Sequence, residues 1–98
     1  MDAGKPQVVR GFMHYFPRAI MEVARISEFG ASKYAWNGWE AVDDGIRRYQ
    51  EAGARHILKE AIEGQNDSDS GLLHLAHEAW NAMATLELKL RELEKTES

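Results

Sequence analysis

The stretch DSDSGLLHLAHEAWNAMATL, residues 67–86, decides how the chain folds. Between Gly71 and Leu86 its single formal charge is Glu78, so we expect a helix here to be covered by protein on most sides. At 3.6 residues per turn, one stripe of this helix nevertheless carries four polar side chains: His74, His77, Glu78 and Asn81. Buried polar groups need partners, and four together indicate a ligand, a metal ion or a hydrogen-bonded network. Two core histidines bonded only to their neighbours are the simpler alternative.

The far side of the same helix is apolar. Spacings of three and four residues there indicate a seam that packs against another helix, made of Ala76, Ala79, Met83, Leu86, Leu90 and Leu93. The helix is predicted from about Gly71 to Glu94, and residues 91–98 read as a polar tail. Because a chain of 98 residues buries a limited share of its surface, we expect dimerisation or higher assembly to complete the core.

Two further helices are predicted upstream. The first starts at Pro17, which suits a first helical turn, and runs through PRAIMEVARISEFGASKYA. The second is capped by Asp43 or Asp44 and ends at Gly64. Residues 1–16 show no sustained period and are expected to lie as an arm across the domain. Without any strand pattern, the sequence predicts one all-α domain over residues 1–98, a small bundle of about three main helices.

Composition excludes several functions. The net charge is −4 and no basic tract occurs, which argues against binding to a nucleic-acid polymer. Cysteine is absent, so disulfides and thiolate metal sites are excluded. No apolar run has the length of a membrane helix, and the start of the chain lacks a signal-peptide pattern. We therefore expect a cytoplasmic protein with no membrane partner.

The polar stripe needs charged partners from the other helices. On the second helix Glu51, Arg55 and Arg48 share a face that Leu58 and Ile62 continue, so we expect this face to be covered. The alternative is an ordinary salt bridge on the surface.

Two other groups of charges are candidates. Glu22 and Lys33 align on one stripe of the first helix, or form a partly exposed charged edge. Asp67 and Asp69 stand before the third helix, where turn chemistry is the alternative.

Carboxylates from separate helices beside a His/Asn stripe suit a hard cation such as Mg²⁺, which also binds substrate phosphates. Arg and Lys would hold phosphate oxygens, and Trp39 or Tyr34 could stack on a base. A zinc site through His74 and His77 is a weaker alternative, because the usual pair of histidines four residues apart is missing.

Three segments carry a resemblance to a known family: EVARISEFGASKYAWNGW at 22–39, YQEAGARHIL at 49–58 and DSDSGLLHLAHEAWN at 67–81. They resemble small, largely phage-encoded dATP/dGTP diphosphohydrolases, which are related to the all-α MazG-type nucleoside triphosphate pyrophosphohydrolases. The chain departs from the family pattern at Gly38, where Asn is usual, and at Glu63-Gly64-Gln65, where Gly-Glu is usual. The paired-glutamate EExxE pattern of MazG proteins has no counterpart at Glu51-Ala52.

The resemblance implies an all-α homo-oligomer, and Mg²⁺-dependent cleavage of a (deoxy)purine triphosphate to monophosphate and pyrophosphate, with Mn²⁺ as a possible substitute. A phage-encoded protein would act in the bacterial host cytoplasm. We expect Glu51, His74 and His77 as catalytic residues. The residues expected to bind substrate are Lys33, Tyr34, Trp39, Arg48, Arg55 and His56, and those expected at the metal are Glu51, Asp67, His77, Glu78, Asn81 and Glu22. The alternative is a non-catalytic helical protein that binds nucleotide or forms oligomers.

Overall fold

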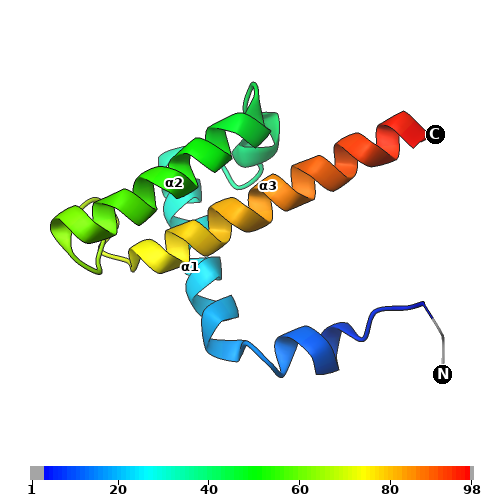
Figure 1. Cartoon of the computed structure of the whole chain (residues 1–98), viewed down its shortest axis with the longest axis horizontal. Helices are drawn as coiled ribbons and strands as arrows, with labels where there is room; N and C mark the ends of the chain where they lie inside the picture. The colour runs from blue at the N-terminus through cyan, green and yellow to red at the C-terminus, as the bar shows by residue number, and fades with distance from the viewer. Residues whose placement is uncertain (1–3, 98) are drawn as a thin grey trace.

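The computed structural model describes residues 4–97, and within them the fold is all-α, as predicted (Figure 1). The long helices are α1 (Pro17–Lys33), α2 (Gly45–Glu63) and α3 (His74–Glu97). Two short turns complete the order, a π-helical turn η1 (Val9–Met13) and a 3₁₀ turn η2 (Gly38–Ala41). The polar tail is thus helical as far as Glu97, and the rest of it, like residues 1–3 of the arm, lies outside the described residues.

The helix ends follow the sequence signals with two differences. Pro17 opens α1, and Gly64 ends α2 with a φ of 103°, a conformation that favours glycine. Asp44 precedes α2 as expected, but its carboxylate pairs with Arg47 instead of capping a backbone N–H. The third helix starts at His74 and not near Gly71, because Gly71 closes a loop turn by donating its N–H to the Asp67 carbonyl.

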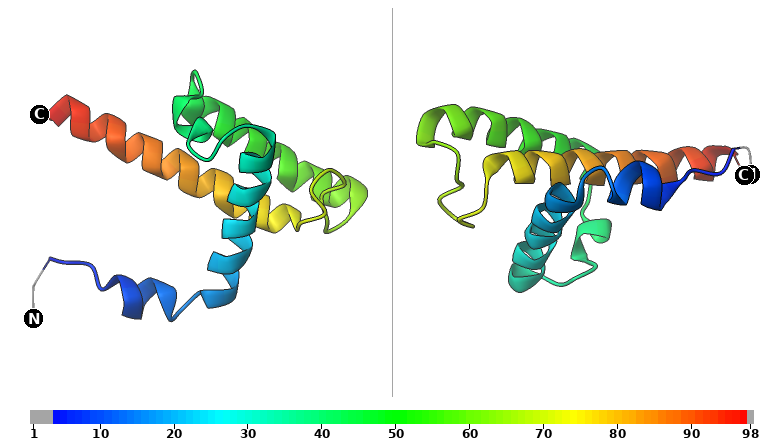
Figure 2. Two further views of the ribbon diagram at one scale, coloured as in Figure 1. Left: turned by 180° about the vertical axis from the view of Figure 1, so that it is seen from behind. Right: turned by 90° about the horizontal axis from the view of Figure 1, so that it is seen from below.

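Helices α2 and α3 form an antiparallel pair joined by residues 64–73 (Figures 1 and 2). Glycines let the two backbones approach. A Cβ atom on Gly53 would lie 3.4 Å from Cβ of Asn81, and one on Gly45 would lie 2.9 Å from a Leu88 methyl group. The glycine-bearing face of α2 is therefore the one that packs on α3.

Helix α1 crosses α3 on the side away from α2 (Figure 2). The crossing is tied by a hydrogen bond from the Trp80 indole N–H to the Ser27 hydroxyl, 2.9 Å long. The Trp80 ring also packs edge-on against Trp39, at 6.1 Å between centroids, and Tyr49, at 5.3 Å. These contacts connect α1, η2, α2 and α3.

The described residues bury little apolar surface. The buried hydrophobic side chains are Ile26, Ala76 and Ala84. From Met83 onward the apolar seam of α3 is exposed within the single chain, as Leu86 and Leu90 illustrate. No helix among the described residues has the length and apolar character needed to span a membrane.

The N-terminal arm differs from the expectation that it crosses the domain. Its described part carries exposed apolar side chains such as Phe12 and Phe16, and it lies apart from the α2–α3 pair, below α3 in the view of Figure 1. Phe12 and Phe16 pack on each other, with ring centroids 5.9 Å apart. Local ring contacts of this kind take the place of the expected packing on the domain.

Candidate functional site

Three potential metal-ligating side chains meet where the 64–73 loop joins α2 to α3. His56 comes from α2, Asp67 from the loop and His74 from the first turn of α3. One ligand atom from each lies within 4.8 Å of the others, and both Asp67 and His74 are buried. Two helices and the loop between them thus supply one cluster.

His74 is fully buried and bonds through both ring nitrogens. Its Nε2 lies 2.8 Å from Oε1 of Glu63, the last residue of α2, and its Nδ1 lies 2.9 Å from Nδ1 of His56. Because a carboxylate only accepts, Nε2 of His74 carries the proton and donates it to Glu63. In the neutral imidazole, Nδ1 of His74 then presents a lone pair toward His56.

His77 lies one turn further along α3 and braces His56. The two rings are stacked, 4.2 Å between centroids and 6° from parallel. The His77 ring also contacts Phe29 of α1. The centroids of these two rings are 6.1 Å apart, and the ring planes are nearly perpendicular. The Nε2 atom of His77 lies 2.7 Å from the Ser70 hydroxyl and 3.8 Å from the Asp67 carboxylate.

The loop holds its own carboxylates in place. The backbone N–H of Ser70 donates to Asp67 at 2.8 Å, and the Ser70 hydroxyl accepts from the Leu72 N–H at 3.1 Å. At the rim, Lys33 binds Asp69 at 2.6 Å and lies over the Phe29 ring, 4.6 Å from its centroid. The C-terminal end of α1 is thereby fixed to the loop.

Burial and neighbouring charges set the protonation of the cluster. Burial, reinforced by the nearby His77, lowers the pKa of His56 to about 4. Burial also lowers the pKa of His77. Burial pushes the pKa of Asp67 upward, but the hydrogen bonds from Ser70 outweigh it, so that pKa lies below its usual range. At neutral pH the cluster therefore combines a carboxylate with neutral imidazoles at positions 56 and 77.

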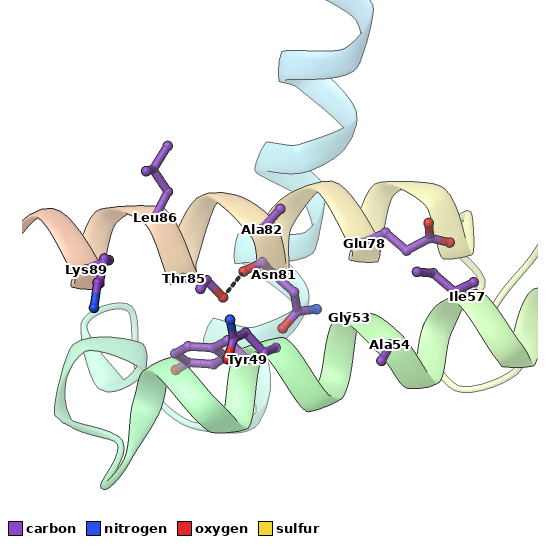
Figure 3. Close-up of a pocket in the computed structure, with 11 residues that line it drawn as sticks. Tyr49, Gly53, Ala54, Ile57, Glu78, Asn81, Ala82, Thr85, Leu86 and Lys89 are labelled. Atoms are coloured by element: carbon purple, nitrogen blue, oxygen red, sulfur yellow. Dashed lines mark hydrogen bonds between the residues drawn. The ribbon is translucent and has the colours of Figure 1, made fainter.

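The rest of the polar stripe lies along a groove between α2 and α3, with a cavity of about 550 Å³ (Figure 3). Asn81 points toward Gly53 and donates to the His77 carbonyl at 2.8 Å. Within residues 4–97, Oε2 of Glu78 is buried and has no hydrogen-bond partner. Burial, together with the nearby Glu60, raises the pKa of Glu78.

An aromatic cavity of about 440 Å³ adjoins the crossing of α1 and α3. Its wall also includes small residues such as Gly30 and Ala31, and Arg48 contributes a cationic side chain. The aromatic side chains of the wall are Tyr34, Trp36, Trp39, Tyr49 and Trp80. Helix α1 contributes to both features, since Gly30 lines the cavity and the neighbouring Phe29 packs edge-on against the His77 ring.

The structure gathers only part of the predicted site. His56, Asp67, His74 and His77 meet, while Tyr34, Trp39 and Arg48 share the aromatic cavity and Lys33 lies at the rim. Glu78 and Asn81 belong to the neighbouring groove. Glu22 instead pairs with Arg25 on α1, at 3.0 Å.

The expectation about α2 is corrected. Glu51 and Arg55 are exposed, and their face continues to Leu58 and Ile62, which are 64% and 83% exposed. Tyr49, Gly53 and His56 lie on the side toward α3 instead, because the missing side chain of Gly53 permits the close approach. Within the single chain, Glu51 and Arg55 therefore do not reach the cluster.

Several contributors were missed from the sequence. His56 was expected to bind substrate and His74 to transfer protons, yet both belong to the group of three side chains that could ligate a metal ion. Glu63 and Ser70 were not predicted as site residues, although each bonds to one of the histidines. The available signal was position: Glu63 ends α2 just before the loop that carries Asp67, and Ser70 lies in that loop three residues after Asp67.

Mg²⁺ does not fit the His56–Asp67–His74 group. The ion prefers six oxygen ligands, whereas two of these three donors are imidazole nitrogens. The buried carboxylate oxygen of Glu78 offers oxygen chemistry, but it lies in the α2–α3 groove. No step of a reaction is therefore assigned to Mg²⁺ at the histidines.

Fold and site together define a small all-α protein with a His/Asp cluster and an aromatic cavity. The family described as dATP/dGTP diphosphohydrolase, N-terminal, matches residues 1–98, and the chain belongs to this family. A dATP/dGTP diphosphohydrolase of Salmonella phage PMBT28 is 36% identical over 67 residues. The match covers 68% of this chain but 22% of that relative, so the chain spans about a fifth of its length. No solved structure matches the chain significantly.

Proposed function

We propose that the chain hydrolyses (deoxy)purine nucleoside triphosphates to the monophosphate and pyrophosphate. The observation that carries the proposal is an aromatic cavity of nucleotide size and a buried His/Asp cluster that share helix α1, where Gly30 lines the cavity and Phe29 packs against His77. The name of the phage relative, dATP/dGTP diphosphohydrolase, supports purine deoxynucleotides as the substrate class. Sites of a few hundred Å³ lined by apolar and aromatic groups suit ligands of nucleotide size.

The cavity would hold the base. Its wall offers flat rings from three segments, and base–aromatic stacking contributes about 1–3 kcal/mol per base. The small side chains of Gly30 and Ala31 keep room for a bicyclic purine. Tyr34 is largely exposed, so it would close over the base from the solvent side.

The triphosphate would extend from the cavity toward the loop. Arg48 on the cavity wall and Lys33 at the rim are the cations on this path. Hydrogen bonding to Asp69 raises the pKa of Lys33, which keeps its ammonium group charged. Mg²⁺ would enter with the triphosphate, whose oxygens are its preferred ligands.

In the reaction, a water oxygen bonds to the α-phosphorus while the bond from that phosphorus to the α–β bridging oxygen breaks, and pyrophosphate leaves. His77 is the residue proposed to take the proton of the water, at Nε2 by way of the Ser70 hydroxyl. Its lowered pKa leaves the ring neutral and able to accept at pH 7. Electrostatic positioning of the phosphates would supply most of the rate.

We also propose that the chain acts as a homo-oligomer. The exposed seam of α3 from Met83 to Leu93 has helix-packing spacing, and a second copy could cover it by two-fold symmetry. Such burial would supply the apolar core that the single chain lacks.

The test is to incubate the purified protein with each of the eight common NTPs and dNTPs, with and without a divalent cation, and to separate products by anion exchange. Monophosphate and pyrophosphate in equal amounts, with a purine preference, are the expected result. Trp39→Ala should raise KM more than it lowers kcat, and His77→Gln should lower kcat. A folded protein that binds nucleotide without forming either product would contradict catalysis and favour a binding role.

A further inference from the structure

The ligand atoms of His56, Asp67 and His74 are placed as a small metal site requires. Two nitrogens 2.9 Å apart can both reach one ion at the usual metal–nitrogen distance of about 2.0–2.1 Å. Ligands on opposite sides of such an ion lie about 4 Å apart. Because no pair in the group is separated by more than 4.8 Å, a small side-chain rotation would complete it.

The surroundings of His74 orient it as a metal ligand. Its Nε2–H donates to Glu63 at 2.8 Å, which fixes the tautomer and aims the Nδ1 lone pair at His56. A carboxylate behind the histidine is the usual outer arrangement of metal-ligating imidazoles. The His56 ring is held in turn by stacking on His77 at 4.2 Å.

Asp67 supplies a buried negative charge that calls for a cation. Its side chain is 4% exposed, and the Ser70 N–H fixes one carboxylate oxygen at 2.8 Å. The basic group within 4 Å of that carboxylate in residues 4–97 is the His77 ring, 3.8 Å away. Lys33, the lysine at the rim, is bonded to Asp69 instead. A divalent ion would compensate the charge.

We propose that His56, Asp67 and His74 bind one divalent transition-metal ion of the Mn²⁺, Co²⁺ and Zn²⁺ class, in preference to Mg²⁺. Two imidazoles and one carboxylate match the ligand preference of these borderline ions and leave positions open for water or phosphate oxygens. Assigning this ion to the hydrolysis rests on the proposed function, but binding itself needs no nucleotide. His77 and Glu63 act as positioning residues.

The experiment uses the full chain, freed of metal by a chelator that is then removed, and Co²⁺ as the probe. Titration should give visible absorption bands of nitrogen-ligated Co²⁺ that saturate at one ion per chain. A large excess of Mg²⁺ should leave the bands unchanged, and Zn²⁺ should displace Co²⁺. Bands that Mg²⁺ abolishes, or the absence of saturable binding in a folded sample, would overturn the proposal.

Matched variants locate the ion. His56→Gln and Asp67→Asn should each weaken Co²⁺ binding at least about tenfold, since even residues behind the ligands change metal affinity by 10–100-fold. His14→Gln is the control, because His14 is the one histidine of the four outside the cluster and is exposed. Equal binding by all three variants would refute the assignment. Circular dichroism establishes that each variant is folded.

A measurement on the wild-type protein covers the case in which the variants unfold. Paramagnetic Co²⁺ should strongly shift the ring-proton NMR signals of His56 and His74 and leave those of His14 in place. Unshifted signals for His56 and His74 at saturation would contradict the site. If nucleotide hydrolysis fails while these shifts appear, the metal site stands and the proposed function falls.

Discussion

Acidification of the metal-free protein should weaken the fold through His56. Burial holds the pKa of this residue at about 4 in the folded chain, against 6.5 for an ordinary histidine. As pH falls below about 6.5 the unfolded chain takes up a proton at His56, while the folded chain does so only near pH 4. The unfolded state binds more protons in this window, so the free energy of unfolding falls as pH falls and levels off below pH 4.

The size of the effect follows from the two pKa values. Between pH 7.5 and pH 5 the two pKa values lower the free energy of unfolding by about 2 kcal/mol, at 1.36 kcal/mol per pKa unit. The ring of His56 is only partly buried, and screening by solvent reduces this to about 1 kcal/mol. For a chain of 98 residues, a loss of 1 kcal/mol lowers Tm by about 4–8 °C.

Urea and thermal unfolding in the presence of a chelator, at fixed protein concentration, measure the loss. His56→Gln lacks the titrating group, so its stability should change less between pH 7.5 and pH 5, by about 1 kcal/mol. Burial also lowers the pKa of His77, which contributes with the same sign in both proteins and cancels in the comparison. His14→Gln should retain the wild-type dependence. Identical pH dependence in wild type and His56→Gln would refute the reasoning.

Three further perturbations test the packing. Gly53→Leu should lower the free energy of unfolding by about 1–3 kcal/mol, because even a Cβ at this position would lie 3.4 Å from Asn81. Gly30 has open space around it, so Gly30→Ala should raise the free energy of unfolding by up to about 1 kcal/mol. Urea unfolding measures both changes. Ser27→Ala removes the acceptor of the Trp80 indole N–H and should lower the free energy of unfolding by about 1–2 kcal/mol. Ser27→Thr keeps a hydroxyl and should lower it less. Equal losses in the two variants would exclude the hydrogen bond as the cause. Leu90→Glu on the exposed α3 seam should lower the molecular mass measured by analytical ultracentrifugation toward that of the monomer. Leu58→Glu on the outer face of α2 is the control and should leave the mass unchanged. The opposite pattern would place the interface on α2.

The third helix was the most predictable element, because the spacing of its apolar residues and its polar stripe both indicate a helix. The scarcity of charge between Gly71 and Leu86 predicts a helix that is covered on most sides. The side with His74, His77 and Asn81 is buried, whereas Leu75 and Leu86 are exposed in the single chain. Its start was placed three residues early. The hydrogen bond from Gly71 N–H to the Asp67 carbonyl closes the loop there, and periodicity carries no information about such a turn.

The packing face of α2 was harder to predict, since two faces of that helix carry plausible residues. The charged face with Glu51 and Arg55 offered obvious partners for the polar stripe, and its Leu58 and Ile62 suggested burial. What decided the packing was the absence of a side chain at Gly53, which brings α2 close to Asn81. A glycine inside a helix was therefore the better indicator of the contact than the charge pattern.

The cluster was only partly predictable because its members come from three segments whose spacing in sequence says nothing about their convergence. Asp67, His74 and His77 lie close together in the sequence, but His56 reaches them only through the antiparallel return of the chain. Glu63 contacts His74 because it is the last residue of α2, and its Oε1 lies 2.8 Å from Nε2 of His74. Such positions follow from the length of α2 and of its connecting loop.

The described part of the chain buries four polar side chains and three apolar ones, and this connects stability to ligand binding. Ile26, Ala76 and Ala84 are the buried hydrophobic residues, whereas Asp67 and His74 belong to the polar set that occupies the end of the α2–α3 pair. A polar core of this kind is stable only while its groups keep their partners. An ion bound to the folded state alone adds RT ln(1 + [L]/Kd), about 2.7 kcal/mol at a hundredfold excess over Kd. The same residues proposed to serve chemistry would then hold α2, the loop and α3 together, so that loss of the ion would loosen the site and the fold at once.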